Sequence, residues 1–278
     1  MSRPLVRLRL GRVVLHVVLV GGAFLSIFPI LWMVVTSIKP NPETLIWPPK
    51  FLPMEPTIQN YIRVFMDWPF LRFFKNSFVF AGISTFFIVL TSAMGGYAFA
   101  KIKFWGRELL FFVFVSTIIL PLESYMIPLY LLTNRLKLLN SHGGLILPFV
   151  IMSFGLFLMR QNIRGIPDEL IDAARIDGYS EFGIFWRVVV PLSKGALSAL
   201  TIYAFLNVWG QFTWPLIVTT TQDMYTTELG LAMFQKAFFI EYALIMAGAV
   251  VTSAPLIIVF LIFQKNIISG ITLTGLKG

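Results

Sequence analysis

Long apolar runs are the feature that most constrains this chain. Six of them approach or exceed the roughly 20 residues that cross a bilayer as a helix. The chain is 57% hydrophobic and only 13% charged, whereas a soluble domain carries about 25% charged residues. We therefore expect an all-α, polytopic membrane protein with six transmembrane helices. These predicted spans lie near Val13–Val35, Phe78–Ala100, Leu109–Leu132, Gly143–Met159, Leu197–Thr219 and Tyr242–Phe263.

The basic residues predict the orientation of the spans. When both termini are placed in the cytoplasm, most of the 22 Lys and Arg residues fall on the inner side. The first apolar run is too long for a signal peptide and lacks a small-residue cleavage pattern, so we interpret it as an uncleaved span. The predicted divisions are a cytoplasmic N-terminal segment (1–12), a first helix (13–35), an extracytoplasmic loop (36–77), a core of five helices (78–265) and a cytoplasmic tail (266–278).

Within the extracytoplasmic loop, a proline-dense segment precedes "NYIRVFMDWPFLRFF", which resembles an aromatic helix lying at the outer interface. The longest cytoplasmic loop is residues 160–194, between the fourth and fifth spans. We call residues 160–194 the acidic loop.

Several functional classes are disfavoured by composition. The chain has no cysteine, which excludes disulfides, thiol catalysis and thiolate metal sites. His16 and His142 lie far apart in sequence, so no metal or other cofactor is expected. The net charge of +9 is spread around apolar runs instead of one polar face, which favours membrane topology over nucleic-acid binding.

The acidic loop concentrates five of the 13 acidic residues of the chain. They are Asp168, Glu169, Asp172, Asp177 and Glu181. Pro167 suits the first turn of a helix, Gly178 a helix stop and Ser180 the cap of a second helix. The loop is therefore predicted to form a helix–turn–helix that Pro191 closes.

The two predicted helices have different faces. Leu170, Ala173, Ala174 and Asp177 recur at helical spacing in the first, and we expect Ala174 to share an exposed face with Leu170. Phe182, Phe185 and Trp186 recur likewise in the second. The hairpin could rest on the inner leaflet, but anionic headgroups would repel its carboxylates. A protein partner is the favoured interpretation.

A family resemblance rests on the same residues. Asp172-Ala173-Ala174, then Gly178, then "VVVP" up to Pro191 resembles the signature loop of binding-protein-dependent ABC importer permeases. That loop usually reads Glu-Ala-Ala, three residues, Gly, nine residues, Ile-any-Leu-Pro, so Asp replaces Glu here and Val replaces Ile and Leu. "NSFVFAGISTFFIVLTSAMGGYAFAKIKFWGR", "FLNVWGQFTWPLIV" and "FQKNIISGITLTGLKG" are similar to the carbohydrate-uptake branch, in particular to the second permease of maltose-type importers.

The resemblance implies a division of labour. It implies a heterodimer with a related permease, two ABC ATPase subunits, an extracytoplasmic solute-binding protein and a place in a bacterial or archaeal plasma membrane. The absence of a GxxxxGK[ST] loop agrees with ATP hydrolysis on another chain, so this chain is not expected to be an enzyme. The implied ATPase-coupling residues are Asp168, Glu169, Leu170, Asp172, Ala173, Ala174, Asp177, Gly178, Phe182, Phe185 and Pro191.

Polar and aromatic residues inside spans suggest a solute pathway, because such groups are costly in lipid unless they are functional or paired. The candidates are Glu123, Asn207, Trp209, Gln211 and Trp214. Tryptophan stacks on a sugar face, and amides bond its hydroxyls. Alternatively, the tryptophans only pack between helices, the amides bond across a subunit interface, and the partner permease holds most of the contacts. A disaccharide, an oligosaccharide or glycerol phosphate would fit this branch.

Two other functional classes of membrane protein would need different sequence features. A solitary secondary transporter would need intramembrane carboxylates or an inverted repeat, and Glu123 is the one candidate carboxylate. A membrane enzyme would need clustered acids, histidines or a metal near the interface. The acidic cluster in this chain is cytoplasmic and lacks histidine.

Overall fold

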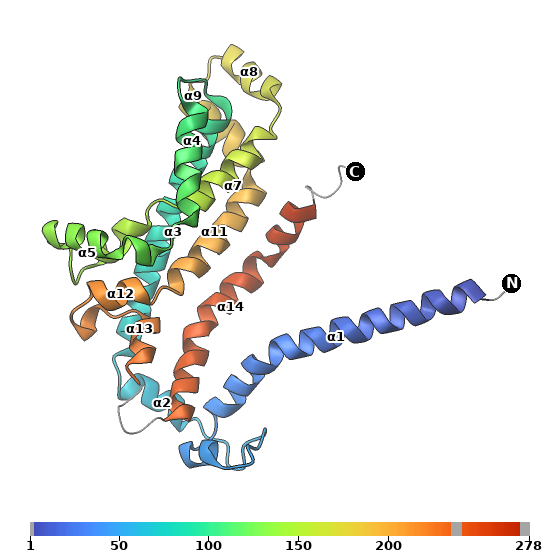
Figure 1. The fold of residues 1–278 in the computed structure, drawn as a ribbon, viewed down its shortest axis with the longest axis vertical. Coiled ribbons are helices and arrows are strands. Elements are labelled where there is room, and N and C mark those ends of the chain that lie inside the picture. The colour runs from blue at the N-terminus through green and yellow to red at the C-terminus, as the bar shows by residue number, and fades with distance from the viewer. Residues whose placement is uncertain (1–2, 235–240, 273–278) are drawn as a thin grey trace. The chain divides into compact units, whose positions relative to one another are not determined.

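The computed structural model describes residues 3–234 and 241–272, and this part of the chain is helical and contains no strand. It divides into two compact units, each described by itself. The first comprises residues 1–68 with 233–253, and the second comprises residues 69–232 with 254–278. Figure 1 shows the helices of both units.

The first unit is built on α1 (Arg3–Ser37), the short 3-10 helix Asn41–Leu45, α2 (Gln59–Met66) and the start of α14 (Tyr242–Thr272). The Asn60 side chain ties α2 to the end of α1, because its amide donates to the carbonyls of Ser37 and Lys39, both at 2.8 Å. Arg63 of α2 pairs with Glu241.

The aromatic stretch that the sequence suggested as one interfacial helix is divided. α2 ends at Met66 and α3 begins at Phe70, so the second half of the stretch belongs to a long helix. Pro69 is the N-cap of α3 and disfavours helical backbone at Trp68, which explains the break.

The second unit is organised around α3 (Phe70–Lys101), with α4 (Arg107–Ser116), α7 (Ser153–Arg164) and α11 (Lys194–Trp209) running alongside it (Figure 1). Shorter helices join them. These are α5 (Met126–Arg135), α6 (His142–Ile146), α8 (Asp168–Ile176), α9 (Glu181–Ile184), α10 (Val190–Leu192), α12 (Thr213–Val218) and α13 (Thr227–Ala232). The core cluster of this unit draws on α3, α7, α8 and α11.

Small residues let α3 and α7 approach closely. A Cβ added to Gly96 would lie 2.7 Å from the Cβ of Met159 and 2.9 Å from the backbone nitrogen of Arg160. One added to Gly155 would collide with the hydroxyl of Ser92. Small-residue contacts of this kind are how helices pack in lipid, where apolar side chains gain little by leaving the solvent.

A buried arginine joins three helices near one end of this packing. Arg160 of α7 donates to the carboxylate of Glu108 on α4 at 2.6 and 2.7 Å and to the backbone oxygen of Phe99 on α3 at 3.1 Å. Its guanidinium also lies over the Phe111 ring, 3.8 Å from the centroid. The charge is therefore fully engaged, as a buried charge requires.

Within the part of the chain that the structure describes, three helices are long and apolar enough to cross a membrane: Val14–Ser37, Phe70–Lys101 and Tyr242–Ile262. Two bent pairs raise the number to five if each pair is one span. These are His142–Phe149 with Ser153–Arg164, bent by 44°, and Glu181–Leu192 with Lys194–Trp209, bent by 82°. The chain is a multi-pass membrane protein by this measure, and the six-span arrangement with both termini inside stays a prediction.

The third predicted span, Leu109–Leu132, is wrong as one continuous helix. α4 ends at Ser116, and two 3-10 turns precede α5. The hydroxyls of Ser116 and Thr117 donate to carbonyls three residues earlier, at 2.8 and 2.7 Å. Pro121 has no N–H to continue the ladder, so the chain turns here.

The fourth and fifth predicted spans are also interrupted. The fourth unwinds at Val150–Met152, just after Pro148. In the fifth, α11 ends at Trp209, and α12 starts at Thr213 as a separate short helix. The predicted end at Thr219 is therefore too late for the long helix.

The glycine packing of α3 gives a first prediction. Gly96→Ala should destabilise the protein by about 1–3 kcal/mol, because the new Cβ meets the backbone of α7. Gly82→Ala is the matched control on the same helix, since nothing lies within 4 Å of its added Cβ. Thermal unfolding of the purified protein in detergent measures both, and equal melting temperatures would contradict this account of the α3–α7 contact.

Candidate functional site

The acidic loop forms the helix–turn–helix that its sequence predicts. Pro167 caps α8, Asp168 and Glu169 occupy its first turn, and Gly178 follows with φ of +83°. Carboxylates suit the positive end of a helix, and glycine suits a positive φ. The Ser180 hydroxyl accepts a bond from Gly183 N at 3.2 Å, which caps α9.

The prediction that Ala174 shares an exposed face with Leu170 is wrong. Ala174 is 6% exposed and lies with Ile171 in the core of the second unit, whereas Leu170 is 46% exposed. Ala173, next in sequence, is exposed instead. The outer surface of α8 is thus displaced around the helix from the predicted one.

The aromatic residues of the second helix also divide between two sides. Phe182 is 63% exposed and Trp186 is 45% exposed, and their rings meet edge to face. Phe185 is only 3% exposed and packs near the Tyr97 ring, so it is not free to meet a partner as predicted. We define the outer face of the acidic loop by its exposed residues Leu170, Ala173, Ile176, Asp177, Phe182 and Trp186.

Pro191 does not end the acidic loop as the sequence suggested. α9 continues into a π-helix at Phe185–Val189 and then into α10, with Pro191 in its first turn. The chain bends at Ser193, between α10 and α11. Since α10 follows the π-helix without a break, Pro191 lies inside a helical segment, where its missing N–H removes one backbone hydrogen bond.

Two residues of α3 hold the acidic loop. Lys101 Nζ donates to the backbone oxygen of Ile166 and to Asp168 Oδ1, both at 2.5 Å. Tyr97 Oη donates to Glu181 Oε2 at 2.5 Å. The bond from Lys101 holds the pKa of the Asp168 carboxyl below its usual range.

A second cation, Arg175, links the two helices of the loop to each other. Arg175 of α8 donates to Asp172 Oδ1 and to Glu181 Oε1, both at 2.9 Å. Glu181 therefore joins α3, α8 and α9 at one carboxylate. Sequence reasoning missed Tyr97, although its spacing of four from Lys101 places both side chains on one side of α3.

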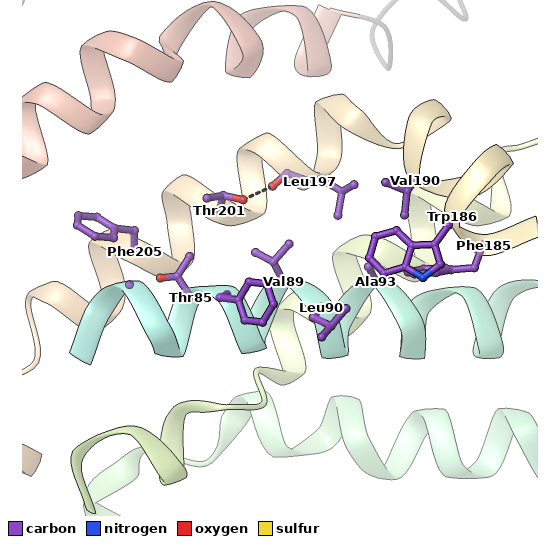
Figure 2. A pocket seen from close by; sticks show the side chains of 12 residues that line it. Thr85, Val89, Leu90, Ala93, Phe185, Trp186, Val190, Leu197, Thr201 and Phe205 are labelled. Atoms are coloured by element: carbon purple, nitrogen blue, oxygen red, sulfur yellow. Dashed lines mark hydrogen bonds between the residues drawn. The ribbon is translucent and has the colours of Figure 1, made fainter. Parts of the chain in front are cut away.

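An apolar pocket of about 480 Å³ lies behind the second helix of the loop. Figure 2 shows Phe185, Trp186 and Val190 at one end of it, and Leu90 of α3 and Leu197 of α11 on its two sides. Thr85 and Thr201 are the polar side chains among its lining residues. The pocket offers little that could orient a polar solute.

A second pocket, of about 590 Å³, is more polar and holds part of the predicted pathway. Asn207 and Gln211 line it, and Gln211 Nε2 donates to the backbone oxygen of Asn207 at 3.3 Å. Four further polar side chains line it that the sequence did not single out. They are Thr117, Tyr125, Ser153 and Tyr203.

Chain breaks surround this second pocket. The 3-10 turns after α4, the unwound residues before α7 and the end of α11 all contribute lining residues. Non-helical backbone at membrane depth is tolerated where it faces protein or a water-filled cavity. We call this space the polar pocket, and its apolar lining includes Ile88 of α3 and Phe154 of α7.

The other three pathway candidates do not line the polar pocket. Trp209 is buried against Phe74, Phe78 and Phe205, and Trp214 is buried with its Nε1 donating to the Gly144 carbonyl at 3.0 Å. Both rings therefore fit the alternative interpretation, in which the tryptophans only pack between helices. Glu123 is exposed beside the pocket.

A cofactor role finds no support in side-chain grouping. Within residues 3–234 and 241–272, no three His, Asp or Glu side chains gather in a way that could hold a metal ion.

The similarities to known proteins agree with this arrangement. Residues 88–272 match the family described as binding-protein-dependent transport system inner membrane component. The chain is 38% identical over 260 residues to an arabinooligosaccharides transport system permease protein of Bacillus subtilis, covering 92% of each chain. It is 31% identical over 275 residues to a trehalose/maltose transport system permease protein of Thermococcus litoralis, covering 97% of this chain and 98% of the other.

A solved structure has the same fold. A bacterial ABC transporter involved in the import of the acidic polysaccharide alginate contains a chain that matches with a TM-score of 0.78 and 25% identity. The match covers 95% of this chain and 98% of the other. The chain belongs to the binding-protein-dependent transport system inner membrane components, the permease subunits of ABC importers, and its relatives in that family are sugar transport permeases.

Proposed function

We propose that this chain is one of two permease subunits of an ATP-driven importer for a sugar or sugar-like solute. Its partners are a related permease, two ABC ATPase subunits and an extracytoplasmic solute-binding protein, in a bacterial or archaeal plasma membrane. The observation that carries the proposal is the two-sided acidic loop. One side is buried and bonded to α3, and the outer face presents apolar side chains.

The outer face suits a protein partner. Ile176 is 87% exposed, and with Leu170, Phe182 and Trp186 it gives a group of large apolar side chains beside carboxylates. Apolar surface rimmed by polar residues marks interaction sites, and aromatic anchors supply much of the binding energy. We propose that a cleft on an ATPase subunit receives this face.

The energy source must then lie outside this chain. No loop that cradles nucleotide phosphates is present in the sequence. Closure of the ATPase pair would move the acidic loop and switch the two permeases between inward-open and outward-open states. The family match and the exposed position of Glu123 do not favour a solitary carrier driven by an ion gradient.

The polar pocket is the proposed contact with the solute. Its amides and hydroxyls can bond sugar hydroxyls, and its tyrosine rings offer apolar faces. The relatives named for their solutes include permeases for arabinooligosaccharides, trehalose or maltose, and sn-glycerol 3-phosphate. We propose a disaccharide, a short oligosaccharide or glycerol phosphate for this chain.

A pair of neighbouring alanines tests the docking surface. Ala173→Trp should weaken ATPase recruitment by up to about a hundredfold, because a bulky ring at a close interface costs about 1–3 kcal/mol. Ala174→Trp should instead lower the yield of folded permease, since that residue is buried. Pull-down of the ATPase in matched detergent, together with the amount of permease heterodimer, distinguishes the two effects.

The backbone of the loop provides a second variant for the same experiment. Gly178→Val should also reduce recruitment, because a β-branched residue resists the φ of +83°. If Ala173→Trp and Gly178→Val both recruit and respond to ATPase as the wild type does, the acidic loop is not the docking element.

Three variants distinguish residues that line the solute pathway from a residue that only packs between helices. Asn207→Leu and Gln211→Leu should reduce uptake at least tenfold at unchanged permease level, because each removes from the polar pocket an amide that could bond the solute. Trp214→Ala should instead cost about 3–5 kcal/mol of stability, since the ring is buried. Uptake and melting temperature are measured for all three. Normal uptake in both leucine variants would remove the polar pocket from the pathway.

The proposed orientation has its own test. A single cysteine at Pro53 should react with an impermeant thiol reagent in intact cells, because the proline-rich loop is predicted to be outside. One at Gly106, beside Lys103 and Arg107, should react only after the membrane is opened. The chain has no native cysteine to interfere. The reverse labelling pattern would contradict the arrangement with the N-terminus inside.

A further inference from the structure

We propose that Tyr97 and Lys101 are positioning residues that make α3 the element through which movement of the acidic loop reaches the polar pocket. The covalent connection from the loop into α11 would then be the more compliant of the two routes. This proposal rests on the proposed function, because it assumes that an ATPase moves the loop.

The two residues hold α8 at both of its ends. Lys101 bonds the Ile166 carbonyl and Asp168, where the chain enters α8. Tyr97 bonds Glu181, which also receives Arg175 from the last turn of α8. Tyr97 is 4% exposed and the Lys101 side chain is 6% exposed, so both donors are held in place by packing, while the Asp168 and Glu181 carboxylates that accept from them are 77% and 46% exposed.

Apolar packing adds further points of attachment between the two ends. Ile171 and Ala174 lie in the core cluster of the second unit together with Tyr97. A helix fixed at each end and packed in the middle cannot pivot without moving what holds it. α8 and the end of α3 are therefore expected to move as one body.

The connection into α11 has a different character. It runs through the π-helix Phe185–Val189 and a bend of 82° at Ser193. π-helical turns are rare inside α-helices and are frequently found at functional sites. Next to this bend lies the apolar pocket of Figure 2, so part of the segment lacks packing on that side.

α3 reaches the polar pocket without interruption. It is one α-helix from Phe70 to Lys101 with no internal proline. Ile88, a lining residue of the polar pocket, lies about 13 Å along the helix axis from Tyr97 at ~1.5 Å per residue. Gly96 locks α3 against α7, which brings Ser153 and Phe154 to the same pocket.

The first test removes the bonds and keeps the shapes. Tyr97→Phe and Lys101→Met, in the complete transporter reconstituted in vesicles, should each lower solute uptake per ATP hydrolysed by about 2- to 30-fold. Recruitment of the ATPase should stay at the wild-type level. The probe is whichever of radiolabelled maltose, arabinotriose and sn-glycerol 3-phosphate the wild type accumulates.

Matched controls separate positioning from general damage. Tyr130→Phe removes a hydroxyl outside the polar pocket lining, and Lys103→Met removes a neighbouring positive charge that bonds neither Asp168 nor Ile166. Both controls should keep the wild-type ratio of uptake to hydrolysis. Loss of folded transporter lowers uptake and hydrolysis together, so it leaves the ratio unchanged. A wild-type ratio in Tyr97→Phe and Lys101→Met would overturn the proposal.

The second test replaces a hydrogen bond by a covalent link. Tyr97→Cys combined with Glu181→Cys should lower the ratio, and a short cleavable bifunctional thiol reagent should restore it, because α3 and the loop are expected to move together. Val190→Cys combined with Leu197→Cys spans the bend, and linking this pair should inhibit uptake until the link is reduced. Inhibition by the first link would overturn the proposal. Normal ATPase recruitment in both Ala173→Trp and Gly178→Val would instead contradict the proposed function on which this proposal rests.

Discussion

The close contact between α3 and α7 is the constraint on which the rest of the second unit depends. Gly96 and Gly155 bring the two helices together, and the buried Arg160 then bonds α3 and α4 from α7. Each end of this packed helix pair contacts a different candidate site. One end carries the acidic loop through Tyr97 and Lys101, and residues farther along α3 and at the start of α7 line the polar pocket. Because tight small-residue packing is stiff, a displacement at one end has few ways to be absorbed before it reaches the other.

Hydropathy located the membrane-spanning material of this chain well but not its breaks. The predicted span Phe78–Ala100 lies within α3, and the apolar part of α14 corresponds to Tyr242–Phe263. The run Leu109–Leu132 looked equally continuous, but it turns at Ser116–Pro121. Averaging over a window of apolar residues hides such breaks, because a hydroxyl bonded to a nearby carbonyl and a missing N–H change hydropathy little. These breaks are also where the polar pocket forms, so the least predictable backbone belongs to the candidate site.

The acidic loop shows which parts of a site can be predicted locally. Capping residues and Gly178 placed its two helices correctly, since each acts through its own backbone. The faces of the helices were predicted less well. Leu170 and Ala174 do lie one turn apart, but Ala174 packs inward with Ile171 and Leu170 does not. Which side of a short helix is buried depends on distant residues such as Tyr97, and periodicity alone does not contain that information. The same holds for Trp209 and Trp214, whose buried rings resembled sugar-stacking residues in the sequence.

The clustered carboxylates of the acidic loop have two different roles. Asp168, Asp172 and Glu181 are bonded to Lys101, Arg175 and Tyr97, so they fix the loop to itself and to α3. Glu169 and Asp177 make no ion pair among the described residues and remain exposed. Exposed charges at the rim of an interface chiefly guide encounter and orientation, whereas buried apolar anchors supply affinity. The arrangement thus divides recognition between two unbonded carboxylates that would orient a basic partner surface and the apolar side chains of the outer face that would hold it. Bonding three of the five carboxylates internally would keep that outer face rigid in the ATPase-coupling role proposed for it.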